Sequence, residues 1–535
     1  MRIVKAKWLL LVGPAVAATA IMSGQASATT LTVCPSGCAF AQIAPALAGA
    51  TEGDTISVGP GSYDGGFTID KSITITGAGA GNTTISGGGP VVMIGIFGAA
   101  SEPTVSISGV TITGGVTRSS PESTAFFGKE GVLAAGGGIE IPPNADFSGG
   151  AAVTISNSVI SGNVVAPTDF VSFHGRSRAF AFGGGIDDRG TLTLAKTTVS
   201  DNRVGSASGL STPAADAEGG GVYTAQGAGA LTISNSVISS NRAAVSAPNG
   251  RVADAGGISF DGTGLTMSNS SVTGNSATVT GSLPSGGVPS GGIHVDGDAL
   301  AATVSNTIIS GNTATMTNAV GNANASSGGL HLDADPSNIS LSNDVIAGNH
   351  VVAATLSGST GHADGSSGAG EISGTLSHVR LTGNTVDVAS VAGGAFAGGG
   401  ASIFDGGSIS NGVVSGNHIQ VSSPLGSVTV RGGGINIAGG ATTLRNTSVG
   451  GNKVDASGAG GSIFGGGIYD VAFPDGQDGP PGGPLYLLNS SITGNVLAAS
   501  AGISSQGGGL FLQNEPLTLT SSVVTQNSPD DCVGC

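Results

Sequence analysis

Five acidic and imidazole side chains recur at matching places in the middle of this 535-residue chain. His294 and His331 each directly follow the aliphatic residue after a Gly-Gly pair, and three aspartates stand two residues further on: Asp261, Asp296 and Asp333. Carboxylate oxygens in one patch can bind a divalent cation such as calcium. Crowded carboxyl groups, with one pKa raised by repulsion, can also supply a general acid or base for polysaccharide cleavage. A solvated polar face produced by repeat duplication is the third interpretation of the same pattern.

These residues share a patch only if the chain repeats, and a repeat is present. A recurring tract ends on an asparagine at eleven places, 32 to 43 residues apart: Asn163, Asn202, Asn241, Asn275, Asn312, Asn349, Asn384, Asn417, Asn452, Asn495 and Asn527. An aliphatic residue stands three and eight positions before each asparagine. Such units are typical of solenoids, in which identical asparagines stack about 4.8 Å apart and bond along the axis.

Each unit also carries the corners that a coil needs. A second asparagine, six residues before the first, recurs in most units and marks a bend between two short strands. A Gly-Gly-Gly-aliphatic signal, as at 136–139 and 183–186, precedes each tract, and another alternation of apolar and polar residues follows it. The pattern predicts three short strands per coil in an all-β, single-stranded parallel β-helix with aliphatic residues inside. We expect eleven such coils over residues 116–527.

The region before the repeats differs. Residues 40–47 predict a short amphipathic helix that covers the first open coil, because a bare solenoid end exposes strand edges. Residues 55–58, 67–69 and 73–75 alternate like the first strands. We therefore expect an N-terminal cap with the first coils at 29–115 and a cysteine-containing tail at 528–535.

Three tracts of this region carry a resemblance to a known family. They are Phe40-Ala-Gln-Ile-Ala-Pro-Ala-Leu47, Gly53-Asp-Thr-Ile-Ser-Val-Gly-Pro-Gly-Ser-Tyr63 and Ile69-Asp-Lys-Ser-Ile-Thr-Ile-Thr-Gly-Ala-Gly79. They resemble the start of pectin-lyase-like right-handed β-helix proteins. The Gly-Gly-Gly-Ile and Ser-Gly-Asn units resemble those of bacterial secreted β-helix repeat proteins and the repeats of polymorphic outer membrane proteins. The resemblance covers about residues 31–527 and implies the right-handed twist.

Two further features could carry function. The resemblance makes Asp187 and Asp188 similar to the paired aspartates of polygalacturonases, and thus catalytic candidates. The insertion at 164–182 is rich in Phe and carries His174, Arg176 and Arg178. Exposed aromatic and arginine side chains favour a partner site, whereas a loop that folds its Phe residues onto the neighbouring coil has no such role.

Composition excludes several classes of protein. Glycine supplies 97 residues and charged residues only 9%, which excludes an ordinary helical enzyme because glycine is a poor helix former. No Gly-X-Y period is present, so the chain is not collagen. The formal net charge of -16 argues against nucleic acid or an anionic membrane as a partner.

The ends of the chain indicate export. A basic start, an apolar core and Ala26-Ser27-Ala28 predict a signal peptide over residues 1–28, with no membrane span after its cleavage. In an exported protein, two local cysteine pairs predict disulfides that pin the ends: Cys34 with Cys38, and Cys532 with Cys535. We therefore expect a secreted, extracellular or cell-surface protein.

Two function classes remain open. The first is a non-enzymatic adhesion, interaction or structural module that meets a polysaccharide or a cell-surface molecule. The second is a carbohydrate-active enzyme, either a polysaccharide lyase or a glycoside hydrolase, as the resemblance implies. No cofactor is firmly indicated beyond calcium at Asp261, Asp296 and Asp333. A cleft around these aspartates and the two histidines would favour the enzyme.

Overall fold

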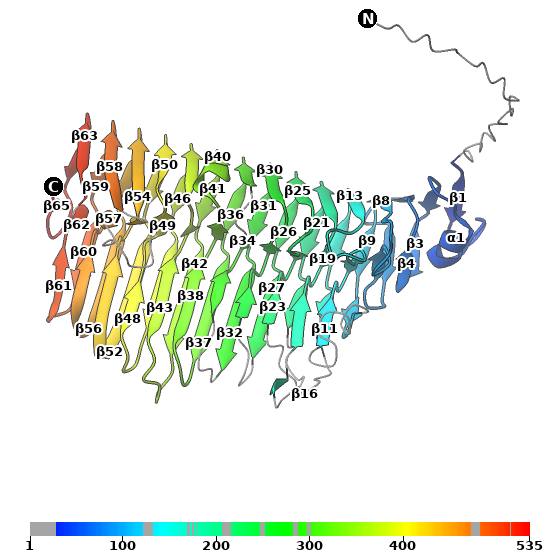
Figure 1. The fold of residues 1–535 in the computed structure, drawn as a ribbon, viewed down its shortest axis with the longest axis horizontal. Helices are drawn as coiled ribbons and strands as arrows, with labels where there is room; N and C mark the ends of the chain where they lie inside the picture. Colours follow the sequence, from blue (N-terminus) through cyan, green and yellow to red (C-terminus); the bar gives the residue numbers. More distant parts are fainter. Residues whose placement is uncertain are drawn as a thin grey trace, which may run out of the picture.

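The chain winds into a right-handed parallel β-helix, as the sequence predicts (Figure 1). The computed structural model describes residues 28–120, 132–167, 172–173, 176–177, 179–205, 216–246, 252–281, 287–296, 301–471, 482–513 and 515–535. Residues 1–27, nearly all of the predicted signal peptide, lie outside this set. None of the described helices has the length and apolar character needed to cross a membrane.

Three long parallel sheets form the body, one strand of each per coil. The first complete coil shows them as β2 (Thr55–Val58), β3 (Gly61–Asp64) and β4 (Phe67–Ile69). In the described part of the chain, the sheets that contain these strands, called A, B and C here, hold 15, 14 and 14 strands. The predicted strands at 55–58 and 67–69 are confirmed, and the third one is β5 (Thr74–Gly77). Aliphatic side chains from all three sheets fill one continuous core.

The N-terminal end is closed by α1 (Ile43–Gly49), the helix predicted at 40–47. Its residues Ile43, Ala46 and Leu47 are buried against the first coil. The ammonium group of Lys71 donates to the carbonyl oxygens of Leu47 at 3.1 Å and Ala50 at 3.0 Å. These bonds satisfy carbonyl groups that the end of a helix leaves free. The helix thus covers strand edges that would otherwise be open.

The eleven predicted asparagines form one buried ladder. In each step the Nδ2 group donates to the Oδ1 atom of the asparagine in the next coil, as from Asn275 to Asn312 at 3.0 Å. The same Nδ2 group of Asn275 donates to the carbonyl oxygen of Ile238, and its backbone N–H also reaches Asn312 Oδ1. The ladder runs without a break from Asn163 to Asn527. Every amide is satisfied inside the protein, so burial costs little.

The second asparagine column makes the bend between sheets A and B. All its members have positive φ, from Asn157 at 48° to Asn343 at 58°. Asparagine tolerates this left-handed conformation better than other residues with a Cβ atom. Lys196, His378 and Ser521 occupy the same corner with φ values of 51°, 57° and 50°.

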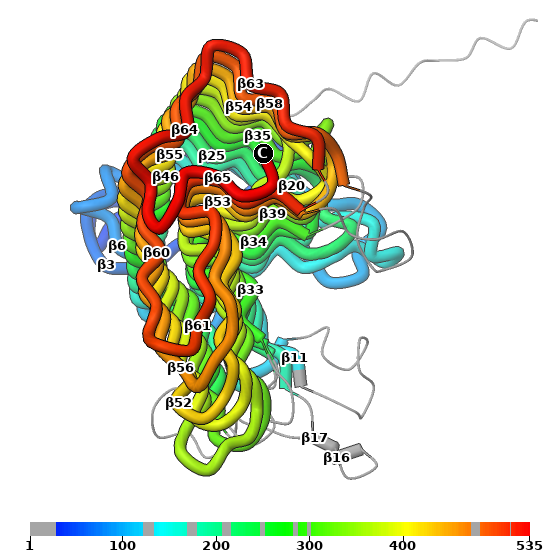
Figure 2. The backbone as a smooth tube through the Cα atoms, turned by 90° about the vertical axis from the view of Figure 1, so that its left-hand side faces the viewer, coloured from blue at the N-terminus to red at the C-terminus, as the bar shows by residue number. Residues whose placement is uncertain are grey.

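Most coils carry an arm beyond the three-sheet body, which the sequence analysis did not foresee. In one such coil, β25 (Ala230–Ser234) and β26 (Val237–Ser239) belong to the body, and β27 (Arg242–Ser246) then runs outward. β28 (Val252–Asp254) returns, and β29 (Ile258–Phe260) resumes sheet C. Alanine and valine side chains fill the thin core between outgoing and return strands. Viewed along the axis, the arm hangs below the body and gives an L-shaped section (Figure 2).

Both predicted disulfides are present, Cys34–Cys38 and Cys532–Cys535. In the C-terminal tail, β65 (Cys532–Val533) pairs with β62 (Leu510–Gln513) of sheet C. Asp531 Oδ1 accepts from the backbone N–H and the Nδ2 group of Asn527, at 2.9 and 3.1 Å. The tail therefore terminates the asparagine ladder.

Candidate functional site

The return strands of the arm meet sheet C along a line that we call the seam. The seam consists of two columns of side chains. One column ends the return strands and includes Phe182, Glu218 and Asp254. The other follows the aliphatic residue of each Gly-Gly signal in sheet C and reads, in register, Glu140, Asp187, Tyr223, Ser259, His294, His331 and Glu371. The predicted outward column of sheet C is thus real, but the arm covers much of it.

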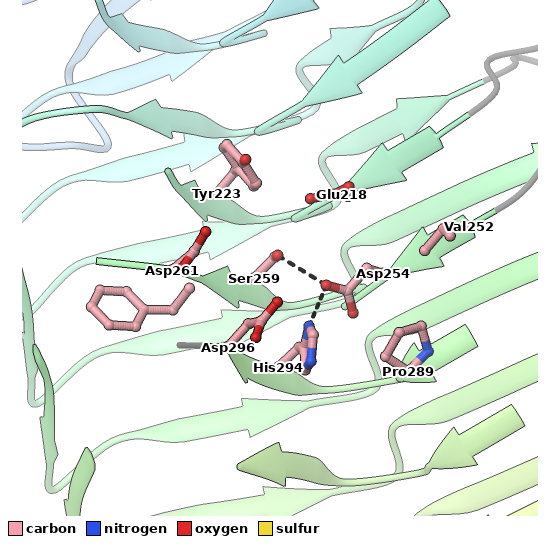
Figure 3. Close-up of a pocket in the computed structure, with 10 residues that line it drawn as sticks. Glu218, Tyr223, Val252, Asp254, Ser259, Asp261, Pro289, His294 and Asp296 are labelled. Carbon is pink, nitrogen blue, oxygen red and sulfur yellow. Dashed lines mark hydrogen bonds and ion pairs between the residues drawn. The ribbon is translucent and has the colours of Figure 1, made fainter. Parts of the chain in front are cut away.

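A hollow of about 230 Å³ lies in the middle of the seam (Figure 3). Its walls come from β23 (Asp216–Glu218) and β28 on the arm, and from β24 (Val222–Thr224), β29 and β34 (Ile293–Asp296) in sheet C. The lining residues are Glu218, Tyr223, Val252, Asp254, Ser259, Phe260, Asp261, Pro289, His294 and Asp296. The hollow therefore brings together three of the five residues that the sequence singled out, Asp261, His294 and Asp296.

Asp254 and His294 form the central contact of the hollow. The Nδ1 atom of His294 lies 2.5 Å from Asp254 Oδ2, and the Ser259 hydroxyl donates to the same oxygen at 3.1 Å. Burial by itself lowers the pKa of His294, but the Asp254 carboxylate outweighs it and raises the pKa to about 9. At neutral pH the pair is therefore an imidazolium against a carboxylate.

Two other carboxyl groups hold their protons unusually tightly. Burial, reinforced by the charges of Asp254 and Asp216, raises the pKa of Glu218 to about 8. Burial and the neighbouring Asp296 raise the pKa of Asp261 to about 6. At pH 7 Glu218 is therefore mostly a neutral acid and can donate a proton, whereas Asp261 is mostly ionised.

The remaining two predicted residues lie outside the hollow. His331 packs edge-on against His294, with ring centroids 5.0 Å apart, and its Nδ1 atom lies 3.4 Å from Glu371 Oε2. Burial lowers the pKa of His331 despite that carboxylate. Asp333 is in register with Asp296 on β39 (Leu330–Asp333) but is exposed and does not line the hollow.

Asp187 and Asp188 point to opposite faces of β19 (Ile186–Asp188), because successive side chains of a strand alternate. Asp187 lies in the seam, where its Oδ2 atom is 3.1 Å from the Arg189 Nε atom. Asp188 faces the core, accepts from the Gly190 N–H at 2.9 Å, and has a pKa raised to about 7 by burial. The two carboxyl groups therefore cannot act on one substrate as a pair.

The calcium hypothesis gains no preformed site. Among the residues that the structure describes, no three His, Cys, Asp or Glu side chains are arranged to hold a metal ion. Calcium needs six to eight oxygen ligands, which Asp261, Asp296 and Asp333 do not assemble here.

Aromatic and arginine side chains occupy the seam on both sides of the hollow. Toward the N-terminus, Phe182 stacks on Tyr223 with centroids 4.4 Å apart, and Arg189 lies 5.6 Å from the Tyr223 ring. Phe182 of the aromatic-rich insertion thus folds onto the next coil and Phe180 lies against Phe182, while His174 and Arg178 lie outside the described residues.

Toward the C-terminus the same arrangement returns. Phe464 and Phe511 lie 4.6 Å apart, Tyr469 stacks on Phe511, and Arg431 lies 5.2 Å from the Phe396 ring. These residues come from the return strands and sheet C, as those at the other end do. The hollow therefore lies between two aromatic clusters of one continuous seam.

Glu218 and Asp254 complete the site and were not predicted from the sequence. A signal for them exists, because each stands at the end of an apolar-polar alternation just before a glycine-rich corner, as do Phe182, Arg431 and Phe464. That position is the arm column of the seam. Without knowledge of a return strand, its side chains could not be assigned to the face that also carries His294.

The fold described above is a parallel β-helix: a capped solenoid with three long parallel sheets. No protein-family model and no curated protein matches the chain. One similar solved structure is an exopolygalacturonase of Yersinia enterocolitica, with 11% identity over 91% of this chain and 75% of that chain and a TM-score of 0.25. A pectin methylesterase of Aspergillus niger has 12% identity over 81% of this chain and 87% of that chain, with a TM-score of 0.16. PfbA, a surface adhesin of Streptococcus pneumoniae, has 12% identity over 90% of this chain and 87% of that chain, with a TM-score of 0.18. These likenesses concern the fold alone.

Proposed function

We propose that the protein is an exported, non-enzymatic interaction module that binds a glycan chain along the seam. The observation that supports this function is the order of side chains in the seam: an aromatic cluster, a polar hollow and a second aromatic cluster. Ligand sites combine apolar surface with a few convergent polar groups. Partly exposed rings such as Phe180, Phe464 and Phe511 offer flat apolar surface, and the hollow offers hydrogen-bonding groups.

The length of this arrangement suits a polymer better than a small molecule. Tyr223 and Tyr469 occupy the same column of sheet C, seven strands apart. At about 4.8 Å per strand they are separated by roughly 34 Å. A ligand that contacts both clusters must therefore be extended, as a polysaccharide chain is.

The proposed setting is outside the cell, in solution or at the surface. It is supported by the signal-like start of the chain and by cysteines placed as two local pairs. The acidic composition makes nucleic acid an unsuitable partner.

Glycan binding is tested on an array of immobilised polysaccharides with the purified secreted chain. We expect retention of at least one extended glycan, and a loss of affinity of about tenfold in Phe464→Ala, because aromatic anchors dominate such contacts. Leu425→Ala is the matched control, since Leu425 is 73% exposed and lies outside both columns of the seam. No binding at all, or equal binding by Phe464→Ala and wild type, contradicts the proposal.

A carbohydrate-active enzyme is the second candidate, supported by the protonated carboxyl group of Glu218 in the hollow. Glu218 keeps its proton at neutral pH beside Asp254 and Asp261, and a neutral acid beside a carboxylate is the pair that glycoside hydrolysis uses. Mass spectrometry of a bound glycan after incubation separates the candidates. Shortened products that disappear in Glu218→Gln, while binding persists, support the enzyme, and an intact glycan supports the binding module.

A further inference from the structure

We infer that the hollow takes a glycan that carries free amino groups, so that a protonated amine of the sugar enters among its carboxylates. This inference rests on the proposed glycan binding and names the chemical class of the ligand. The inference is based on the negative charge of the acidic residues that line the hollow.

Acidic groups reach the hollow from both of its walls. Glu218 and Asp254 come from the arm, with Asp216 near Glu218, and Asp261 and Asp296 come from sheet C. Among the described residues, the cationic groups that act on these carboxyls are His294, already paired with Asp254, and Arg189, which lies beside Asp187. His331 stands behind His294 and is held by Glu371. The unbound hollow therefore has an excess of negative charge.

Asp254 supplies a second observation that points to a ligand. The residue is 4% exposed and lines the hollow, yet its Oδ1 atom has no hydrogen-bond partner among the described residues. A buried carboxylate oxygen without a partner is unfavourable. Figure 3 shows the Ser259 and His294 bonds reaching one Asp254 oxygen while the other is left without a bond. A ligand ammonium group would supply both the donor and the opposite charge.

The alternatives fit the hollow less well. A uronate sugar would bring a further carboxylate beside the four acidic residues that line the hollow, and like charges within a few ångströms repel strongly in a partly buried site. A neutral sugar hydroxyl can donate to Asp254 Oδ1 but adds no positive charge beside Asp261 and Asp296. Only an amine satisfies the orphan oxygen and offsets the charge excess together.

Binding of an ammonium group also has a proton signature. The raised pKa values of Glu218 and Asp261 mean that both carboxyls carry protons in part near pH 6 to 7. A positive ligand favours their ionised forms, and the bound complex therefore releases protons. An uncharged ligand of the same length has no such effect.

The inference is tested by calorimetric titration of the full chain at pH 6 with three probes: a glucosamine hexamer, an N-acetylglucosamine hexamer and a hexagalacturonate. We expect the amine-bearing hexamer to bind at least tenfold more tightly than its acetylated counterpart, to weaken with salt, and to release protons in buffers of different ionisation enthalpy. Asp296→Asn, at an exposed position, should reduce the amine preference about tenfold. Asp254→Asn gives a second, independent variant if the first has only a small effect.

The matched control is Asp387→Asn, which removes the same charge from the outgoing side of the arm, where Asp387 pairs with His350. It should bind the amine-bearing hexamer as wild type does. Equal or tighter binding of the acetylated hexamer or of the galacturonate, still sensitive to Phe464→Ala, overturns the amine inference and leaves glycan binding intact. Failure of every probe and of the polysaccharide array overturns both.

Discussion

Two columns of side chains run the length of this molecule, and they differ in one respect. The ladder from Asn163 to Asn527 keeps one residue type in all eleven coils, and each member before Asn527 makes the same bonds to the asparagine of the next coil. The sheet C column of the seam changes from coil to coil, from Glu140 and Asp187 through Tyr223 to His294. Both columns have the same spacing and are set by the same coil.

The difference separates stability from function. In the ladder each side chain must bond to the equivalent side chain of the coils above and below. Such a column admits one residue type, because any other side chain leaves buried donors unsatisfied. A column that faces the seam is free of that requirement, so its residues can be chosen for a ligand. The repeat therefore builds the scaffold, and departures from the repeat mark the site. Four changes test this comparison.

The largest effect is expected from the middle of the ladder. Asn312→Ala removes the acceptor of the Asn275 Nδ2 and backbone N–H groups and the donor to Asn349 Oδ1. Unsatisfied buried groups cost about 1 to 3 kcal/mol each, so the free energy of unfolding should fall by about 3 kcal/mol or more. Denaturant unfolding measures it, with Ser259→Ala in the seam as the control, expected to lose about 1 kcal/mol. Equal losses in both variants would remove the distinction between the columns.

The bend between sheets A and B gives the next effect. Asn306 has a φ of 51°, and a β-branched residue there is strained. Asn306→Val should lower the free energy of unfolding by about 2 kcal/mol, whereas Asn306→Gly should change it little. Thermal unfolding of the two variants provides the comparison. A Val variant as stable as the Gly variant would show that the corner does not require the left-handed conformation.

The seam predicts a pH dependence that the ladder lacks. Glu218 has a pKa raised to about 8 and His294 one raised to about 9, so these two seam groups hold more protons in the folded state than in the unfolded state through neutral pH. The free energy of unfolding should therefore fall as the pH rises from about 5 to 9. Glu218→Gln removes one of these protons. The fall in the free energy of unfolding between pH 6 and 8 should therefore be smaller than in wild type by on the order of 1 kcal/mol.

Unfolding followed at several pH values by circular dichroism checks this dependence. Asp335→Asn is the control, because hydrogen bonds from Ser337 outweigh burial and lower the pKa of this carboxyl. An unchanged slope in Glu218→Gln would place the proton uptake outside the seam.

The smallest effect sharpens the boundary of the site. Asp333→Asn changes an exposed residue that is in register with Asp296 but lies outside the hollow. It should alter the free energy of unfolding by less than about 0.5 kcal/mol and leave binding of the glucosamine hexamer unchanged. A clear loss of binding in this variant would extend the site beyond the hollow, as the sequence alone suggested.

The sequence predicted the scaffold closely and the site in part. Period-two alternation, the asparagine column and the glycine corners define the coil locally, so strands such as 55–58 and the cap helix were recovered. His294, Asp261 and Asp296 were found because acidic and imidazole side chains recur at matching places in consecutive units. The arm was missed because its alanine-rich return strands, as in Asp216–Glu218 and Val252–Asp254, are too short to show a strong period. Their pairing partners are the return strands of the neighbouring coils, which lie tens of residues away in the sequence.

The most direct test of the account is the structure of the full chain crystallised with the glucosamine hexamer. The account predicts sugar density in the hollow, with one amine nitrogen about 2.8 Å from Asp254 Oδ1 and neighbouring sugar rings along the seam toward Tyr223 or Phe464. Density on the outgoing strands of the arm or on sheets A and B, with an empty hollow at saturating ligand, would contradict it.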